Sequence, residues 1–297
     1  MRVLVFGATG ILGHQLMRRL GRRFEVYGTV RRESDLAQAA ASWSAAGILG
    51  GVAVEDPGSV SRAIRIVRPH AAVNCIASPP WLQTRGDLNA CIAVNAKFPH
   101  DLAGLCENAG ARLIHISTDG VFSGSRGQYT ECDPCDATDP YGKAKFLGEV
   151  SGPNCLTLRT SFIGRDLRRP GSGLLEWLLS QRGRAVKGYR RSFFTGLTSG
   201  ALSDVIQGVL SGHPTLAGLF HVAGPRISKL ALLEALRDRF KLSIRIEPDD
   251  STVCDRSLDG FAFERRTGIR PPSWPAMLEE LYPEPPLPRI EAAACKA

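Results

Sequence analysis

The 297-residue sequence predicts an α/β fold, in which a doubly wound parallel sheet is joined to a smaller C-terminal α/β lobe. Two observations support this prediction. Short apolar runs rich in β-forming residues alternate with helical patterns over residues 1–160. The first apolar run is followed at once by a glycine-rich turn and an amphipathic helix. Alternation of this kind is typical of parallel strands with helices on both faces of the sheet.

The individual elements follow from these patterns. In the first part of the chain we expect strands at 1–6, 25–30, 51–54, 71–77, 112–117 and 155–160, and helices at 14–20, 34–46, 57–67, 89–109 and 140–149. Further along we expect helices at 173–181, 199–211 and 228–240, and a strand at 218–223. Residues 1–160 are therefore assigned to a first domain. Residues 161–282 form mainly the smaller lobe, with segments returning to the first domain, and the Pro- and Ala-rich residues 283–297 form a flexible tail.

A glycine motif, Gly7-x-x-Gly10-x-x-Gly13, lies between the first strand and the first helix. Glycine permits the tight turn and lets the backbone approach a pyrophosphate, and the helix N-terminus offers free N–H groups to that anion. In this position the motif predicts a Rossmann-like dinucleotide-binding domain. The residues expected to bind the cofactor here are Gly7, Thr9, Gly10, Ile11, Leu12 and Gly13.

The second strand ends in Arg31 and Arg32. NAD enzymes usually place an acidic residue there to bind the ribose 2′-hydroxyl, whereas arginine matches a phosphate group. We therefore expect the cofactor to be NADP(H), with NAD(H) remaining possible. The alternative is that both arginines are solvated loop residues.

Tyr141 and Lys145 form the second motif, four residues apart in a predicted helix. Residues at this spacing share one face of a helix. An ammonium group beside a phenol favours the phenolate, so we expect Lys145 to lower the pKa of Tyr141. The pair would then exchange a proton with a carbonyl or hydroxyl group, and Lys145 would also donate to the nicotinamide ribose.

Several polar residues are expected near this pair. Thr118 follows the strand at 112–117. We favour Thr118 over Ser117 as the hydroxyl that binds the substrate oxygen. The alternative is that Thr118 only caps the strand. Ala77 ends the strand expected at 71–77 and Ser78 follows it, and both are assigned to the cofactor site. Asn95 is assigned there too, and it either serves a proton relay with Lys145 or only ties backbone segments together.

The chain resembles extended short-chain dehydrogenases/reductases, and among them dTDP-4-dehydrorhamnose reductases and their relatives. The resemblance rests on the glycine motif and on Asn74-Cys-Ile-Ala77, Val94-Asn95, Ser117-Thr-Asp-Gly-Val-Phe122, Tyr129-Thr-Glu131, Pro140-Tyr-Gly-Lys-Ala-Lys145, Gly148-Glu149, Leu158-Arg-Thr160 and Gly218-Leu-Phe-His221. It implies a Thr118/Tyr141/Lys145 triad, a nucleotide sugar held by the smaller lobe, and NADPH-dependent reduction of a 4-keto-6-deoxy sugar in deoxysugar and polysaccharide biosynthesis.

The substrate contacts expected from the motifs and their surroundings are Ser78, Trp81, Thr118, Gly120, Phe122, Arg159 and Trp177. Gly120 replaces the tyrosine that is usual in the reductases, so a different sugar is plausible. Arg159 and the basic run of Arg182, Arg184, Lys187, Arg190 and Arg191 are candidates for the substrate diphosphate, although such a run is more often a solvated face.

Other activities compete with reduction. One is that of a nucleotide-sugar epimerase that keeps its cofactor bound, and another is the role of a non-catalytic regulatory subunit on the same fold. A 4,6-dehydratase is disfavoured, because those enzymes carry a glutamate where Gly120 stands.

Composition limits the remaining function classes. The net charge is +8, but the basic residues are spread along the chain without aromatic platforms, which disfavours nucleic-acid binding. Neither a membrane-length apolar stretch nor a signal peptide is visible, so a cytoplasmic location is expected. Of the eight cysteines only Cys132 and Cys135 have a Cys-x-x-Cys spacing, and no second pair completes a metal site. A homodimer is considered possible.

Overall fold

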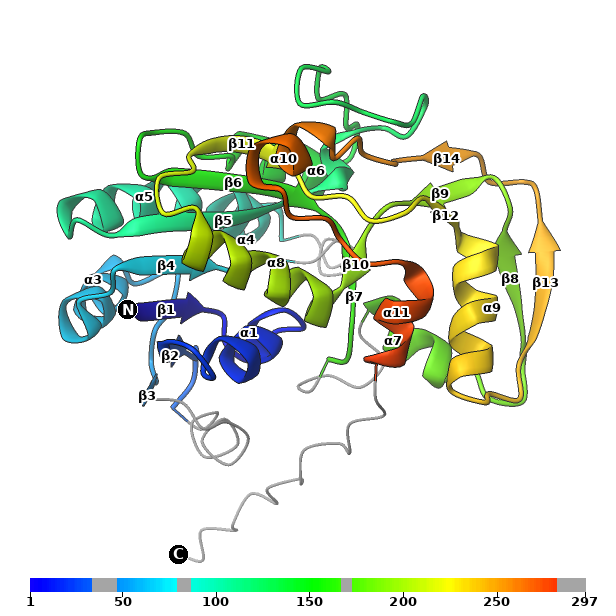
Figure 1. Ribbon diagram of the computed structural model, residues 1–297, viewed down its shortest axis with the longest axis horizontal. Coiled ribbons are helices and arrows are strands. Elements are labelled where there is room, and N and C mark those ends of the chain that lie inside the picture. The colour runs from blue at the N-terminus through cyan, green and yellow to red at the C-terminus, as the bar shows by residue number, and fades with distance from the viewer. Residues whose placement is uncertain (34–46, 79–86, 167–172, 282–297) are drawn as a thin grey trace, which may run out of the picture.

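The computed structural model describes residues 1–33, 47–78, 87–166 and 173–281. Its centre is a seven-stranded sheet in which all neighbouring strands are parallel (Figure 1). In spatial order the strands are β11 (Gly218–His221), β6 (Cys155–Thr160), β5 (Arg112–Thr118), β4 (Ala71–Asn74), β1 (Arg2–Phe6), β2 (Glu25–Thr29) and β3 (Gly47–Leu49). The strand order reverses between β1 and β4, and ligands of such sheets bind at this point, beyond the carboxyl ends of the strands.

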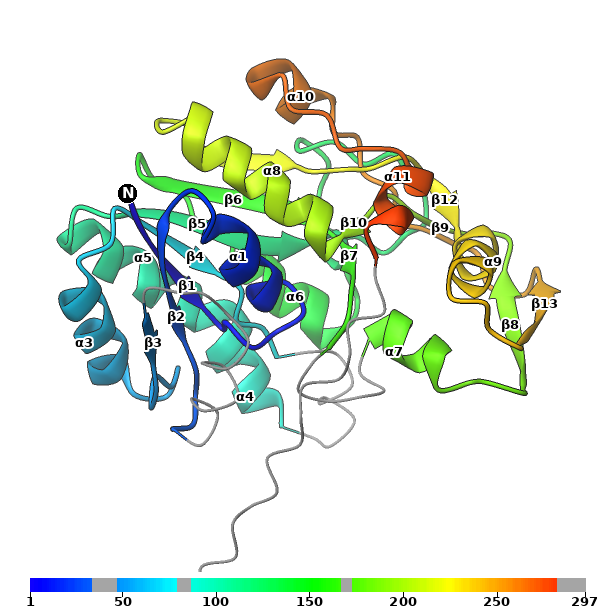
Figure 2. The ribbon, with the colours of Figure 1, turned by 60° about the horizontal axis from the view of Figure 1, so that its bottom comes forward.

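Helices cover both faces of the sheet. They are α1 (Gly13–Leu20), α3 (Pro57–Val67), α4 (Leu88–Ile92), α5 (Phe98–Asn108), α6 (Pro140–Leu147) and α8 (Ser199–Gly212). Successive residues of a strand point to opposite faces. Val3 and Val5 of β1 therefore join the core beneath α1 and α8, whereas Leu4 and Phe6 join the core beneath α3 and α5. Figure 2 shows α1 and α8 side by side on the same face.

Two predicted elements differ from the structure. The third strand lies at Gly47–Leu49 rather than 51–54, because Gly51 turns the chain with a φ of +67° directly after it. The expected single helix at 89–109 is divided into α4, a π-helical turn at Ala93–Lys97, and α5. Pro99 lies in the first turn of α5 and has no N–H for an intrahelical hydrogen bond, so the regular pattern is interrupted just before it. The helix expected at 34–46 lies outside the described residues.

The smaller lobe lies beyond the carboxyl ends of the central strands (Figure 1). In it β8 (Ala185–Tyr189) pairs with β13 (Arg245–Asp249), and β9 (Ser192–Phe194) pairs with β12 (Ile227–Ser228) and β14 (Cys254–Asp255). The short strands β7 (Phe162–Ile163) and β10 (Leu197–Thr198) connect it to the sheet, and its helices are α7 (Gly173–Leu179), α9 (Lys229–Arg239) and α11 (Trp274–Glu279). Helix α10 (Phe261–Thr267) returns to the central sheet and packs against β11. None of the helices described in the structure has the length and apolar character needed to cross a bilayer.

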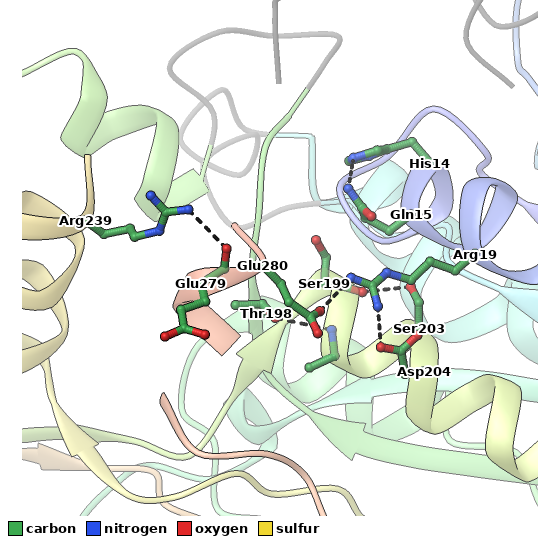
Figure 3. A network of polar contacts seen from close by, with 11 residues as sticks. His14, Gln15, Arg19, Thr198, Ser199, Ser203, Asp204, Arg239, Glu279 and Glu280 are labelled. Carbon is green, nitrogen blue, oxygen red and sulfur yellow. Dashed lines mark hydrogen bonds and ion pairs between the residues drawn. The ribbon is translucent and has the colours of Figure 1, made fainter. Parts of the chain in front are cut away.

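Arg19 joins three separate parts of the chain (Figure 3). Its guanidinium, at the end of α1, donates to the carboxylate of Asp204 on α8 and, at 2.7 Å, to Glu280 just after α11. The Arg19 side chain is 18% exposed. These bonds hold the end of α11 against the first helix of the sheet domain.

Candidate active site

Helix α6 places Tyr141 beside the end of β5. Asp139 begins the helix, because its carboxylate accepts a hydrogen bond of 2.9 Å from the Gly142 N–H, and Pro140 occupies the first turn. A β-carbon at position 142 would collide with the carbonyl oxygen of Gly120. Glycine at 142 therefore allows the first turn of α6 to lie directly on the loop that follows β5.

The Tyr141 phenol lies close enough to the Thr118 hydroxyl for that hydroxyl to lower the pKa of the phenol. The Thr118 oxygen accepts a hydrogen bond of 3.0 Å from the Gly120 N–H. Ser117, the alternative to Thr118 in the sequence, donates to Glu149 at 2.8 Å and is buried. Thr118 is thus the hydroxyl that lies beside the Tyr141 phenol.

Lys145 is buried beneath the same site, with 2% of its surface exposed. Its ammonium donates a hydrogen bond of 2.7 Å to the carbonyl oxygen of Ile116 and lies 3.5 Å from Nε2 of His115. Burial lowers the pKa of Lys145 to about 8, against the opposing effect of the Glu149 carboxylate. Burial also lowers the pKa of His115, and the Lys145 charge lowers it further, so the imidazole is neutral at pH 7.

The predicted lowering of the Tyr141 pKa by Lys145 is wrong for this arrangement. Burial raises the pKa of Tyr141 above its ordinary value, and the Asp119 carboxylate raises it further, while the neighbouring Thr118 hydroxyl opposes both. The Lys145 ammonium is directed at the Ile116 carbonyl. The effect of burial on the pKa of Tyr141 is therefore larger than any effect of the Lys145 charge. Tyr141 is therefore a neutral phenol at pH 7, which is the form that can donate a proton.

The glycine turn forms a cradle of backbone at the switch point of the sheet. Gly7 has a φ of +81°, and its carbonyl accepts a hydrogen bond of 3.0 Å from the Gly10 N–H. A β-carbon on Gly13 would collide with the Gly7 carbonyl, so α1 could not begin so close to β1 with a larger residue. Among the described residues, no side chain forms a capping hydrogen bond at Leu12, the residue before α1. The turn therefore fits the pyrophosphate of a dinucleotide.

Arg31 and Arg32 follow β2, and both are exposed. The Arg31 guanidinium forms an ion pair of 2.9 Å with Glu55, and both of these side chains are more than half exposed. Both guanidinium groups therefore face solvent, and that of Arg31 is paired with the Glu55 carboxylate.

Asn95 holds the segment that follows β4. Its side-chain oxygen accepts a hydrogen bond of 3.0 Å from the Ser78 N–H, and its side-chain nitrogen donates one of 3.1 Å to the Ser78 carbonyl. The side chain is fully buried. These bonds match the interpretation that Asn95 ties backbone segments together, and they position Ala77 and Ser78 at the carboxyl end of β4.

Residues 1–282 match the family model of the RmlD substrate binding domain. The chain belongs to this family.

Three relatives illustrate the similarity. A protein of Streptomyces antibioticus named as a probable dTDP-4,6-dihydroxy-2-methyloxan-3-one 4-ketoreductase is 27% identical over 96% of this chain and 95% of its own length. A dTDP-4-dehydrorhamnose reductase of Burkholderia thailandensis is 30% identical over 55% of this chain and 50% of its own length. The solved structure of dTDP-4-dehydrorhamnose reductase from Bacillus anthracis, in complex with NADP, has a TM-score of 0.76 at 20% identity, over 94% of this chain and 98% of that one.

Two of the residues expected to contact the substrate in this member of the RmlD family are buried. Arg159 is 4% exposed, and its guanidinium forms two hydrogen bonds of 2.7 Å with the Glu149 carboxylate. Phe122 has no exposed surface and stacks on Tyr129, with ring centroids 4.1 Å apart. Both side chains therefore have partners inside the protein.

The remaining residues expected to contact the substrate are not all buried, and they lie in separate parts of the structure. Gly120 lies against Thr118 and Tyr141, and a β-carbon there would stand 3.7 Å from the Tyr141 ring. Trp177 on α7 is 37% exposed. Trp81 lies outside the described residues. In the basic run, Lys187 pairs with Asp249 at 2.8 Å and Arg190 pairs with Asp250 at 2.7 Å, which favours a solvated face for that run.

Sequence reasoning missed three charged residues near the catalytic pair. Asp119 follows Thr118 directly, and Lys229 and Arg256 lie close enough to lower the pKa of its carboxyl. Asp119 was visible within the strand-end motif. Lys229 and Arg256 are distant in sequence, and only the packing of the smaller lobe brings them to this point.

Proposed function

We propose that this protein uses NADPH to reduce the 4-keto group of a nucleoside-diphosphate-linked 6-deoxy sugar. The observation that carries the proposal is the contact between the Tyr141 phenol and the Thr118 hydroxyl at the carboxyl end of β5, with Lys145 buried one helical turn away. The names of the two sequence relatives, a 4-ketoreductase and a dTDP-4-dehydrorhamnose reductase, support this reaction class.

Each residue of the triad has a distinct task. Tyr141 is kept neutral and donates its proton to the oxygen of the ketone as that oxygen gains negative charge. Thr118 holds the same oxygen by a hydrogen bond. Lys145 fixes α6 against β5 and offers its ammonium group to the nicotinamide ribose. The bound cofactor supplies the hydride.

We propose that the glycine turn binds the cofactor pyrophosphate and that Arg31 and Arg32 bind the 2′-phosphate of NADP(H). The Bacillus anthracis structure is a complex with NADP, which is consistent with this choice. Replacing both arginines by alanine tests it. The ratio of the KM values for NADH and NADPH should fall towards one, and an unchanged ratio refutes the assignment.

We further propose that residues 1–160 hold the cofactor and that the smaller lobe within residues 161–282 holds the nucleotide sugar. Gly120 and Trp177 are proposed to be among the residues that contact this sugar.

A homodimer is also proposed. Exposed apolar residues on the adjoining helices α4 and α6, among them Ile92 and Phe146, support it. Sedimentation of the purified protein would test this assembly. A cytoplasmic location stays a prediction.

The decisive experiment is a panel of nucleoside-diphosphate 4-keto sugars, assayed with NADPH by the absorbance of reduced nicotinamide. Stoichiometric oxidation of NADPH with formation of a new sugar alcohol supports the proposal. Sugar isomerisation by a tightly bound cofactor, without net consumption of NADPH, would show an epimerase instead. Absence of turnover, together with stable co-purification of another enzyme, would indicate a regulatory subunit.

A further inference from the structure

Asp119 is a titratable group at the catalytic centre to which the proposed mechanism gives no task. Its carboxylate accepts a hydrogen bond of 3.2 Å from the Thr118 hydroxyl. On its other side it is hydrogen-bonded to the Ser161 hydroxyl. Asp119 therefore lies next to the residue that contacts the proton donor.

Tyr141, Thr118 and Asp119 lie one after another: the Tyr141 phenol neighbours the Thr118 hydroxyl, and that hydroxyl donates a hydrogen bond of 3.2 Å to the Asp119 carboxylate. The middle member is a hydroxyl, which both donates and accepts and can therefore pass a proton on. The Tyr141 phenol thus has a carboxyl group within reach through one intervening side chain.

Other polar groups around Tyr141 are engaged elsewhere. Both polar atoms of Asn95 are bound to the backbone of Ser78. The Lys145 ammonium donates to the Ile116 carbonyl. The Asp139 carboxylate caps α6. Among the described residues that contact this region, Asp119 is the acid joined to Tyr141 by a hydroxyl.

We propose that Asp119 returns to Tyr141, through Thr118, the proton that the phenol gives to the substrate. When Tyr141 has become a phenolate, the Thr118 hydroxyl passes its proton to it and receives another from the Asp119 carboxylic acid. The tyrosine is then neutral, Asp119 is a carboxylate, and solvent restores its proton. The relay rests on the proposed ketone reduction. Asp119 acts through Thr118 and is a supporting residue, with no contact to the substrate.

The surroundings of Asp119 are compatible with a role in returning the proton, and they also allow a different role. Burial raises the pKa of Asp119, against the lowering effects of Lys229, Arg256 and the hydrogen bonds from Thr118 and Ser161. The raised pKa keeps more of the acid protonated at a given pH. Lys229 begins α9, and the buried Nε of Arg256 has no hydrogen-bond partner in the described part of the chain. The rival role for Asp119 is to neutralise these two cations.

The variant Asp119→Asn keeps the shape of the side chain but has no carboxyl proton to give. The first turnover uses the proton already on Tyr141, so its rate should change by less than about twofold. Later turnovers wait for reprotonation, so kcat should fall at least about tenfold. Rapid mixing with NADPH and a keto sugar accepted by the wild type should therefore show a burst of one equivalent per site. An equal loss in both phases, or no loss in either, overturns the relay.

A second variant separates proton transfer from charge balance and remains informative if the first fails to fold. In Asp119→Ala, added formate can carry a proton, whereas chloride can only balance the charges of Lys229 and Arg256. Restoration of later turnovers by formate and not by chloride supports the relay, and equal restoration by both overturns it.

The exposed carboxylate of Asp250 provides a control, because Asp250→Asn removes one negative charge in the smaller lobe and should leave both phases unchanged. A wild type that reduces no keto sugar refutes the proposed function itself. Normal wild-type turnover combined with the absence of a burst in Asp119→Asn refutes the relay alone.

Discussion

The Lys145 ammonium donates a hydrogen bond of 2.7 Å to the carbonyl oxygen of Ile116. This bond joins α6 to β5 inside the protein, just ahead of the strand end that carries Thr118. The same two elements bring the Tyr141 phenol to the Thr118 hydroxyl. Lys145 therefore fixes the geometry of the proton donor, and its effect on the phenol pKa is secondary to that of burial.

Burial of Lys145 should appear in the pH dependence of stability. Its pKa in the folded protein is about 8, below the ordinary 10.5. Between these values the unfolded chain binds more protons, so the free energy of unfolding rises with pH from about 8 to about 10.5, and below 8 this contribution is constant. Urea unfolding of the wild type and Lys145→Met across this range should give curves that diverge above pH 8. Parallel curves would show that the ammonium is not buried.

The ion pair between Glu149 and Arg159 is the one whose loss should cost most stability. Both side chains are less than a tenth exposed. Glu149→Gln leaves a buried guanidinium without its counter-charge, and we expect unfolding to become easier by about 3–5 kcal/mol. The exposed pair of Arg190 and Asp250 is the matched control, and Asp250→Asn should cost no more than about 1 kcal/mol. Equal costs in chemical unfolding would contradict the difference in burial.

Glu55 should weaken the preference for NADPH. Its carboxylate pairs with Arg31, and such exposed pairs are worth about 0–1 kcal/mol. Glu55→Gln frees the guanidinium for a cofactor phosphate, so the KM for NADPH should fall by up to about fivefold while that for NADH stays constant. The difference should shrink as salt is added. An equal change in KM for both cofactors would mean that Arg31 does not bind the 2′-phosphate of NADPH.

Arg19 should control how firmly the C-terminal part of the chain is held. Its bonds to Asp204 and Glu280 are charged hydrogen bonds, so Arg19→Met should cost about 1.5–3 kcal/mol in unfolding free energy. It should also speed protease cleavage beyond α11. Arg22, an exposed residue just beyond α1, is the control, and its replacement by methionine should change neither quantity. Identical cleavage of both variants would show that Arg19 does not hold this end.

The sequence was sufficient for the order of most elements of the sheet, because apolar runs and glycine turns are local signals. It also placed Tyr141 and Lys145 on one face of a helix, since that follows from spacing alone. The π-helical turn before α5 was missed because Pro99 lies inside an otherwise helical pattern.

Other features of the site depend on contacts between distant residues. Arg159 was expected to contact the substrate because it lies near the end of a strand. Its burial against Glu149, which shows that the side chain is internal, is visible only in the structure. The pKa of Tyr141 depends on how deeply α6 is buried, which the sequence does not state. The Lys229 charge acts on the Asp119 carboxyl because the fold of the smaller lobe brings the start of α9 near the end of β5, and no sequence spacing records that proximity.

The most direct test of the central claim is the rate of NADPH-dependent keto-sugar reduction by Tyr141→Phe. Phenylalanine keeps the ring and removes only the hydroxyl that lies beside Thr118. We predict that kcat falls by about 10²–10⁴-fold, while the KM for NADPH and the folded state are preserved. A variant that reduces the sugar at the wild-type rate would contradict the account, because the proton would then come from another group.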